Sequence, residues 1–289
     1  MKMDRKYKIA GHVFSVSGDR LIEAVERIEG FRPFELVGEE TASFTFREGV
    51  LDEMPEILAV QYRFEYEDVT GTFCSTAGGY LLVLKPETED PFYMWCRKGE
   101  SMVSLCGNWS MRLYRFALWV AYGLMTLDTG TLAIHSSCIV YRGKAVLFLG
   151  ESGTGKSTHT RLWREHIPGA VLLNDDSPMI RVENGKVWAY GSAWSGKTPC
   201  YKNERYELAG CVRLSQAPAN EIRELSVLQA YGALHPSCAP EFAYDEVLYD
   251  AVSRTIGQIL SVVPFYHLAC LPNGGAVRLS CRTVFGEEV

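Results

Sequence analysis

The residues best suited to chemistry form a glycine-rich segment, Gly150-Glu-Ser-Gly-Thr-Gly-Lys-Ser157. It fits the pattern GxxxxGK followed by Ser or Thr, with an apolar run before it and a stretch of about three helical turns after it. Glycines let the backbone curl so that successive N–H groups face an anion, and the start of the next helix adds partial positive charge. The segment therefore predicts a cradle for the phosphates of a nucleoside triphosphate, with contacts expected from Gly150, Ser152, Gly153, Thr154, Gly155, Lys156, Ser157 and Thr158.

Within this cradle, two side chains have expected roles of their own. Lys156 can reach the β- and γ-phosphates, and its charge offsets theirs during transfer. The hydroxyl of Ser157 can bind Mg²⁺, which bridges the same phosphates.

A second segment, Gly191-Ser-Ala-Trp-Ser-Gly-Lys-Thr198, fits the same pattern but has no glycine in its middle. It also carries a bulky tryptophan where a backbone would have to approach phosphate closely, and Pro199 follows it directly. We interpret it as a loop on the substrate side, with Lys197 facing an anion and contacts from Trp194, Ser195, Gly196 and Lys197. An ordinary turn and a second phosphate loop are the alternatives.

Two adjacent carboxylates, Asp175 and Asp176, follow the apolar run 170–173, which we expect to be a buried strand. Open α/β sheets gather their ligands at the carboxyl ends of strands. Because successive strand residues point in opposite directions, the two carboxylates cannot share one task. One would bind Mg²⁺ and the other would accept the proton of an attacking hydroxyl. A turn with a helix-capping aspartate is the alternative.

A hairpin is predicted for residues 136–149, around a tight turn that contains Arg-Gly. If Val140 pairs with Ala145, His135 lies opposite Gly150, at the mouth of the glycine segment. The histidine would then raise the proton affinity of the catalytic base or orient it. A histidine that simply ends a strand is the alternative.

A second hairpin is predicted for residues 179–190, because Asn184-Gly185 is the strongest short hairpin signal. Its register would bring Ala193 and Trp194 back toward the acidic pair.

The elements that must position these residues begin near residue 113. Residues 1–112 contain short apolar runs separated by turn residues, with one helical stretch near 21–28, and predict a smaller β-rich N-terminal domain. Residues 113–130 read as an apolar connecting helix. From residue 131, strands alternate with helices, so residues 113–289 are predicted to form an α/β domain that carries the phosphate loop.

Composition narrows the class of partner. The formal charge is -6, the pI is about 5.6 and no basic run occurs, so neither nucleic acid nor anionic lipid is an expected partner. The most apolar stretch, 113–127, contains Arg115 and is too short to span a bilayer. No apolar leader with a cleavage site follows the charged first residues, which favours the cytoplasm. Self-association as a homo-oligomer stays open.

The run Ile134-His135-Ser136, the glycine segment and Leu172-Leu-Asn-Asp175-Asp176 together resemble the catalytic domain of HPr serine kinase/phosphorylase. That family is related to the phosphoenolpyruvate carboxykinases, and the resemblance covers roughly residues 131–289. It implies an HPr kinase-like P-loop fold that uses ATP and Mg²⁺. It also implies that Asp175 is the general base, assisted by His135, and that Asp176 and Ser157 bind the metal.

The sequence departs from this family in three places. Thr158-His159 stand where these kinases usually have an acidic residue, and their downstream signature for the protein substrate and phosphorolysis has no counterpart. Residues 191–198 and 201–205 occupy the place of that downstream signature. The first hundred residues do not match the usual regulatory domain. The chain therefore looks like a diverged HPr kinase-related protein.

The leading hypothesis is an ATP- and Mg²⁺-dependent kinase that transfers the γ-phosphoryl group to a hydroxyl acceptor. The acceptor could be a serine of a protein or peptide, or a small-molecule alcohol. A nucleotide-sensing binding module without turnover is the main alternative. A carboxykinase-like enzyme is a third, although the sequence lacks the dedicated His/Lys/Asp metal set that it would need.

Overall fold

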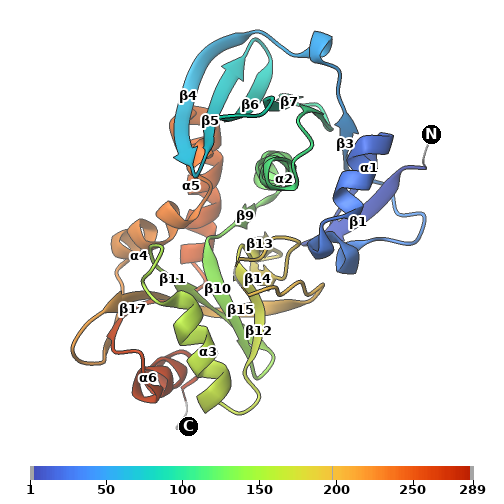
Figure 1. The fold of residues 1–289 in the computed structure, drawn as a ribbon. Helices are drawn as coiled ribbons and strands as arrows, with labels where there is room; N and C mark the ends of the chain where they lie inside the picture. Colours follow the sequence, from blue (N-terminus) through green and yellow to red (C-terminus); the bar gives the residue numbers. More distant parts are fainter. Residues whose placement is uncertain (1–2, 197, 287–289) are drawn as a thin grey trace. The chain divides into compact units, whose positions relative to one another are not determined.

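The computed structural model describes residues 3–196 and 198–286, and the chain divides into two compact units (Figure 1). The first unit comprises Met1–Thr126 together with Pro240–Tyr249, and the second comprises Leu127–Ala239 together with Asp250–Val289.

The division falls after Thr126 rather than near residue 112. Helix α2 (Met111–Thr126) packs inside the first unit, where the hydroxyls of Tyr114 and Tyr122 donate to the backbone carbonyls of Ala24 and Ile9. The expected connecting helix is therefore a core element of the first unit. None of the described helices is both long and apolar enough to cross a membrane.

Within its described residues, the first unit contains one sheet in the order β1-β2-β3-β8-β7-β6-β5-β4, which curves around α2 (Figure 1). The strands predicted within residues 1–112 and the helix predicted near 21–28 are present. The elements are β1 (Arg5–Ile9), β2 (His12–Ser17), α1 (Asp19–Glu26), η1 (Glu29–Phe34), β3 (Phe44–Glu48), η2 (Leu51–Glu53), β4 (Ile57–Tyr66), β5 (Val69–Thr76), β6 (Gly79–Pro86), β7 (Phe92–Arg97), β8 (Met102–Gly107) and η5 (Pro240–Tyr244).

In the second unit, the described strands run in the order β12-β10-β11-β15-β14-β13-β9, and β17 pairs with both β15 and β16. Helix α5 begins in the segment that belongs to the first unit and continues in the second. The elements are η3 (Leu127–Thr129), β9 (Thr131–Ala133), β10 (Ser136–Tyr141), β11 (Lys144–Leu149), α3 (Lys156–His166), β12 (Val171–Asp176), β13 (Met179–Glu183), β14 (Lys186–Tyr190), β15 (Arg205–Gln216), β16 (Glu221–Glu224), α4 (Val227–Leu234), η4 (His235–Ser237), α5 (Glu246–Leu260), β17 (Phe265–Cys270) and α6 (Gly274–Phe285).

One face of this second sheet is covered by α3 and α6, which lie side by side (Figure 1). Trp163 of α3 is fully buried there and packs with Phe148 of β11 and Phe285 of α6. Because side chains alternate along a strand, the residues next to these core positions point to the opposite face.

Both predicted hairpins are confirmed. Strands β10 and β11 pair with Val140 opposite Ala145, and β13 and β14 join through Asn184-Gly185. Both central residues of the second turn have positive φ, 51° and 74°, as a type I′ turn requires.

Candidate functional site

The glycine segment forms the loop between β11 and α3, so the strand-loop-helix context predicted for it is present. Gly150, Gly153 and Gly155 have φ values of 149°, 83° and 101°, a region that other residues rarely adopt. A Cβ added at Gly150 would lie 2.6 Å from the hydroxyl oxygen of Thr154. The loop therefore depends on glycine for its tight course, and the N-terminus of α3 opens onto it.

Lys156 begins α3 and folds back over the loop. Its Nζ donates to the carbonyl oxygens of Gly150 at 2.8 Å and Glu151 at 3.2 Å. Burial lowers the pKa of the lysine, while Asp176 and Asp175 act in the opposite direction. The ammonium group thus lies at the loop and within the electrostatic field of both aspartates.

A β-bulge sets the directions of the two aspartates. Strand β12 pairs with β10, and its register skips Leu173: Leu172 lies opposite Ile139, but the next pair joins Asn174 to Cys138. One extra residue in a strand turns the side chains that follow it. As a result Asp175 points to the face covered by α3, and Asp176 points to the opposite face.

Asp175 is buried, with 5% of its surface exposed. Its Oδ1 accepts hydrogen bonds from the hydroxyls of Ser137 at 2.7 Å and Ser157 at 3.2 Å. These two donors fix the orientation of the buried carboxylate. Asp175 and the first turn of α3 therefore form one hydrogen-bonded group.

Asp176 is half-exposed and lies beside His135, with its Oδ1 3.7 Å from the histidine Nε2. Its φ of 134° is strained for a non-glycine residue, and strain of this kind is concentrated at functional sites. The backbone N–H of His135 donates to Ser237 at 2.7 Å, which holds the histidine at the start of β10. Its pKa is lowered mainly by burial and then by Lys156, against the two aspartates, so the imidazole is neutral at pH 7.

These contacts pair the side chains differently from the expectation. The resemblance implied that Ser157 would share the metal with Asp176 and that His135 would assist Asp175. In the structure Ser157 contacts Asp175, and His135 lies beside Asp176. The reason is the bulge, which decides which carboxylate faces α3.

The predicted substrate loop does return to the acidic pair, but its described residues support the strand rather than an open surface. Trp194 is 3% exposed, and its carbonyl accepts from Asn174 at 2.9 Å. Ser195 is equally buried and donates to the carbonyl of Asp175 at 3.1 Å. Both side chains are enclosed in this structure, and the expectation that Trp194 and Ser195 contact substrate stays a prediction. Lys197 lies outside the described residues.

Gly196 has a positional role in the same loop. Its N–H donates to the carbonyl of Asp175, and a Cβ there would lie 3.1 Å from the Cβ of Asp176. Absence of a side chain at this position allows the loop to close on the end of β12.

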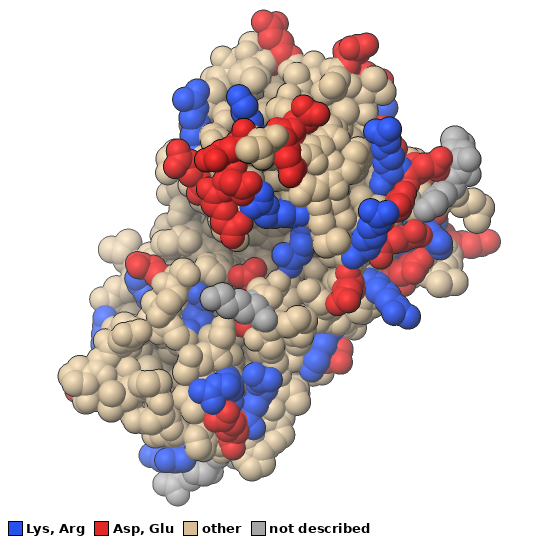
Figure 2. All heavy atoms as spheres, viewed as in Figure 1, with Lys and Arg blue, Asp and Glu red and all other residues tan. Residues whose placement is uncertain are grey.

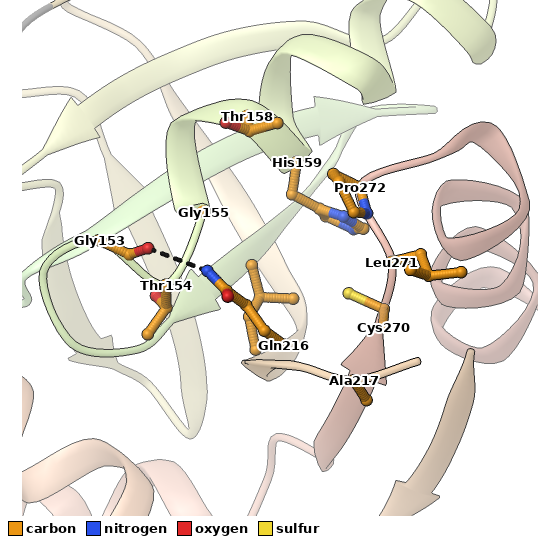
Figure 3. Close-up of a pocket in the computed structure, with 11 residues that line it drawn as sticks. Gly153, Thr154, Gly155, Thr158, His159, Gln216, Ala217, Cys270, Leu271 and Pro272 are labelled. Carbon is orange, nitrogen blue, oxygen red and sulfur yellow. Dashed lines mark hydrogen bonds between the residues drawn. The ribbon is translucent and has the colours of Figure 1, made fainter. Parts of the chain in front are cut away.

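A cavity of about 630 Å³ adjoins the glycine loop on the side of α3 (Figure 3). Its walls are largely apolar, and Gln216 reaches across to donate to the carbonyl of Gly153 at 3.4 Å. His159 lies on the far wall, beside Leu271 and Pro272. The Nε2 of His159 accepts from the indole N–H of Trp163 at 3.2 Å, and burial lowers its pKa to about 4, so the ring is neutral.

Sequence reasoning missed three residues of this site. Ser137, the nearest donor to Asp175, and Asn174, which ties β12 to the returning loop, could be recognised only with the register of β10 and β12 known. Gln216 lies far along the chain, at the end of β15, and no local pattern marks it.

Among the residues that the structure describes, no group of three or more His, Cys, Asp or Glu side chains is arranged to hold a metal ion. At the start of α3, the Ser157 hydroxyl and the Asp175 carboxylate place two hard oxygen donors 3.2 Å apart. This pair suits a cation that completes its shell with phosphate oxygens and water, as Mg²⁺ does.

No protein-family model and no curated protein matches the chain. Among solved structures, 39 chains match, and one of these is the HPr(Ser) kinase/phosphatase from Coxiella burnetii. That match has 12% sequence identity and a TM-score of 0.31, and it covers 53% of this chain and 93% of the other. At this TM-score the likeness is a partial one of fold, and by itself it assigns neither a site residue nor an activity.

Proposed function

We propose that the chain is a Mg²⁺-dependent kinase that transfers the γ-phosphoryl group of ATP to a hydroxyl acceptor. The observation that carries this proposal is the division of the acidic pair. One carboxylate is hydrogen-bonded to the serine that follows Lys156, and the other is half-exposed beside a neutral histidine. A phosphoryl-transfer site needs one group that binds Mg²⁺ and a separate group that accepts the proton of the acceptor hydroxyl.

The donor phosphates would be held by the glycine loop. Its backbone N–H groups, the N-terminus of α3 and the ammonium of Lys156 supply positive charge in one place. Lys156 would exchange its contacts with the carbonyls of Gly150 and Glu151 for the phosphate oxygens. Its lowered pKa is raised again by that added negative charge, so it stays protonated when the donor binds.

Ser157 and Asp175 would hold Mg²⁺. When bound, the ion offsets negative charge on the transferring phosphoryl group. Ser137 keeps Asp175 oriented by its hydrogen bond of 2.7 Å. This assignment exchanges the roles that the family resemblance implied for the two aspartates.

Asp176 would accept the proton of the acceptor hydroxyl. Its half-exposed side chain can be reached by a second substrate, whereas the buried Asp175 is enclosed by Ser137 and Ser157. His135 would act as a positioning residue whose neutral ring limits the freedom of the carboxylate. The strained backbone at Asp176 would hold it in place for this task.

The cavity beside the loop would receive the nucleoside. Its volume of about 630 Å³ lies in the range of small-molecule sites, and its mainly apolar wall with one amide, Gln216, suits a base. The acceptor would be a serine of a protein or peptide, or a small alcohol.

Nucleic acid is not proposed as a partner. On the face shown in Figure 2, basic side chains of the described residues are interspersed with acidic ones and form no continuous basic surface. The net charge of -6 agrees with this.

Transfer from γ-labelled ATP tests the proposal. The purified chain is incubated with Mg²⁺, the labelled nucleotide and a panel of hydroxyl compounds and serine peptides, and label is followed by mass spectrometry and chromatography. We expect Mg²⁺-dependent label on an acceptor, abolished in Lys156→Ala and retained in Lys186→Ala, a control on the surface of the same unit. Label that reaches only water, or none at all across the panel, would contradict the kinase assignment.

A further inference from the structure

A second cavity, of about 510 Å³, adjoins the glycine loop on the face of the sheet opposite to α3. Glu151 and Thr154 border it from the loop, and Gln229 and Gly232 border it from α4. Its floor is formed by the ends of β15, β16 and β17. It shares Thr154, Leu214 and Gln216 with the cavity proposed for the nucleoside, whereas its arginines and His267 belong to this cavity and not to that one.

Three basic side chains lie in one cross-strand row on that floor. Arg213 of β15 is the register partner of His267 of β17, and His267 is the register partner of Arg223 of β16. The neighbours Val212, Leu214 and Leu268 belong to the core beneath α3 and α6. Because side chains alternate, the row faces the other way, into the cavity.

The row is electrostatically unusual. Like charges opposite one another across strands are destabilising, and here the two guanidinium groups flank one histidine. Neither arginine has a carboxylate partner among residues 3–196 and 198–286, and Arg223 donates to the amide oxygen of Gln229 at 3.0 Å. The cavity is lined by one carboxylate, that of Glu151, and by two guanidinium groups, so it has an excess of positive charge.

His267 does not add to this charge. Its Nε2 is 2.9 Å from the hydroxyl of Ser215, and its pKa is lowered by burial and by Arg223 and Arg213. The imidazole is therefore neutral, and an anion between the guanidinium groups would raise its pKa. The pKa of His267 therefore reports whether an anion is bound in this pocket.

The same row continues to the acidic pair. Asp176 lies opposite Ser136, and Leu149, the residue before the glycine loop, lies opposite Arg213. Extending the β10–β11 register by one residue pairs Ser136 with Leu149. Asp176 and Arg213 thus project from one face at one edge of the sheet, three strand spacings or about 14 Å apart at their Cα atoms.

We propose that the Arg213–His267–Arg223 pocket binds an oxyanion, a carboxylate or a phosphate, that the phosphoryl acceptor itself carries, so that the enzyme selects acidic acceptors. Guanidinium groups match both oxyanions with paired N–H donors. The donor phosphates already have the loop amides and Lys156, and the nucleoside has the cavity on the α3 side. An acceptor hydroxyl at Asp176 would place the rest of that molecule along the row toward Arg213. This proposal rests on the kinase function.

The pocket is tested first as an anion site, without an acceptor. The glycine loop is filled with Mg²⁺ and a non-hydrolysable ATP analogue, and inorganic phosphate is titrated while the imidazole of His267 is followed by NMR, assigned with His267→Gln. We expect saturable binding that raises the pKa of His267. The response should be lost in Arg213→Gln/Arg223→Gln and kept in Arg161→Gln, a control that removes a charge from α3. An unchanged response in the double variant would overturn the site.

The acceptor role is tested with matched pairs, hydroxy acids against their amides and serine peptides with Glu against the same peptides with Gln. Loss of one charge-assisted contact costs about 1.5–3 kcal/mol, so we expect the acid member to be preferred by at least about tenfold in kcat/KM. The double variant should lose this preference and keep its KM for ATP.

Three outcomes would refute this role. The first is equal transfer to both members of each pair. The second is a loss of ATP affinity in the double variant that matches its loss of acid preference, which would mean that the arginines stack on the nucleobase. Absence of transfer to every acceptor overturns the kinase function and the acceptor role with it, whereas transfer without acid preference overturns the acceptor role alone.

Discussion

Replacing Glu241 by Gln should stabilise the first unit at neutral and alkaline pH and have little effect at pH 4. Glu241 belongs to η5, is 2% exposed, and its Oε2 has no hydrogen-bond partner among the described residues. Burial raises its pKa to about 7 from an ordinary value of 4.5. The folded state therefore holds a proton that the unfolded chain has already released.

The magnitude follows from linkage. A carboxyl whose pKa is raised in the folded state contributes to the free energy of unfolding. That contribution is fully present below pH 4.5, and it is lost as the pH rises through 7. With 1.36 kcal/mol per pKa unit, the wild-type chain loses about 1.4 kcal/mol by pH 5.5 and about 3 kcal/mol by pH 7, relative to a neutral side chain. Gln keeps the size of the side chain and stays neutral throughout.

Urea unfolding of both proteins, followed by tryptophan fluorescence between pH 4 and pH 9, measures this difference. We expect two curves of stability against pH that coincide near pH 4 and separate by about 3 kcal/mol above pH 7, with the variant the more stable. Curves that run parallel over the whole range would refute the reasoning. Tyr62, whose pKa is raised by burial and by Glu241, titrates above this range and does not disturb the comparison.

Three further predictions concern the second unit. Its stability should fall by about 3 kcal/mol as the pH drops from about 6.5 to about 4, because burial lowers the folded-state pKa of His159 to about 4. In the same denaturation assay, the stability of His159→Gln should depend less steeply on pH over this acid range. An unchanged dependence on pH would count against this prediction. Gly196→Ala, whose Cβ would press on Asp176, should lower kcat by about tenfold or more with little change in KM for ATP; steady-state kinetics with an unaltered kcat would contradict this. Ser137→Ala leaves the Asp175 carboxylate one donor short and should cost about 1–3 kcal/mol at pH 7, measured by urea unfolding, and a cost near zero would show that the bond at 2.7 Å is dispensable.

The parts of the fold that the sequence predicts are those governed by local chemistry. The Asn184-Gly185 turn needs positive φ at two successive residues, so it is visible in two letters, and the register of that hairpin then follows. The glycine loop is equally local, since its glycines and Lys156 lie within eight residues. Pairing Val140 with Ala145 was enough to bring His135 to the loop.

What the sequence could not provide depends on pairing between distant strands. The extra residue in β12, Leu173, has no signature of its own, yet it decides that Asp175 rather than Asp176 faces Ser157. The same holds for segment 240–249, which returns to the first unit although it lies far along the chain. The cross-strand row that contains Arg213 likewise exists only once three strands are aligned.

The most direct test of the central claim, that the two aspartates have different tasks, compares Asp175→Asn with Asp176→Asn. Mg²⁺-dependent binding of an ATP analogue is measured by calorimetry, and phosphoryl transfer is measured with labelled ATP. We predict that Asp176→Asn binds the nucleotide with nearly unchanged affinity and loses transfer by about a hundredfold or more, as expected for loss of a general base. Asp175→Asn should lose the Mg²⁺ dependence of binding together with transfer. The reverse pattern, with metal dependence lost only in Asp176→Asn, would contradict the account.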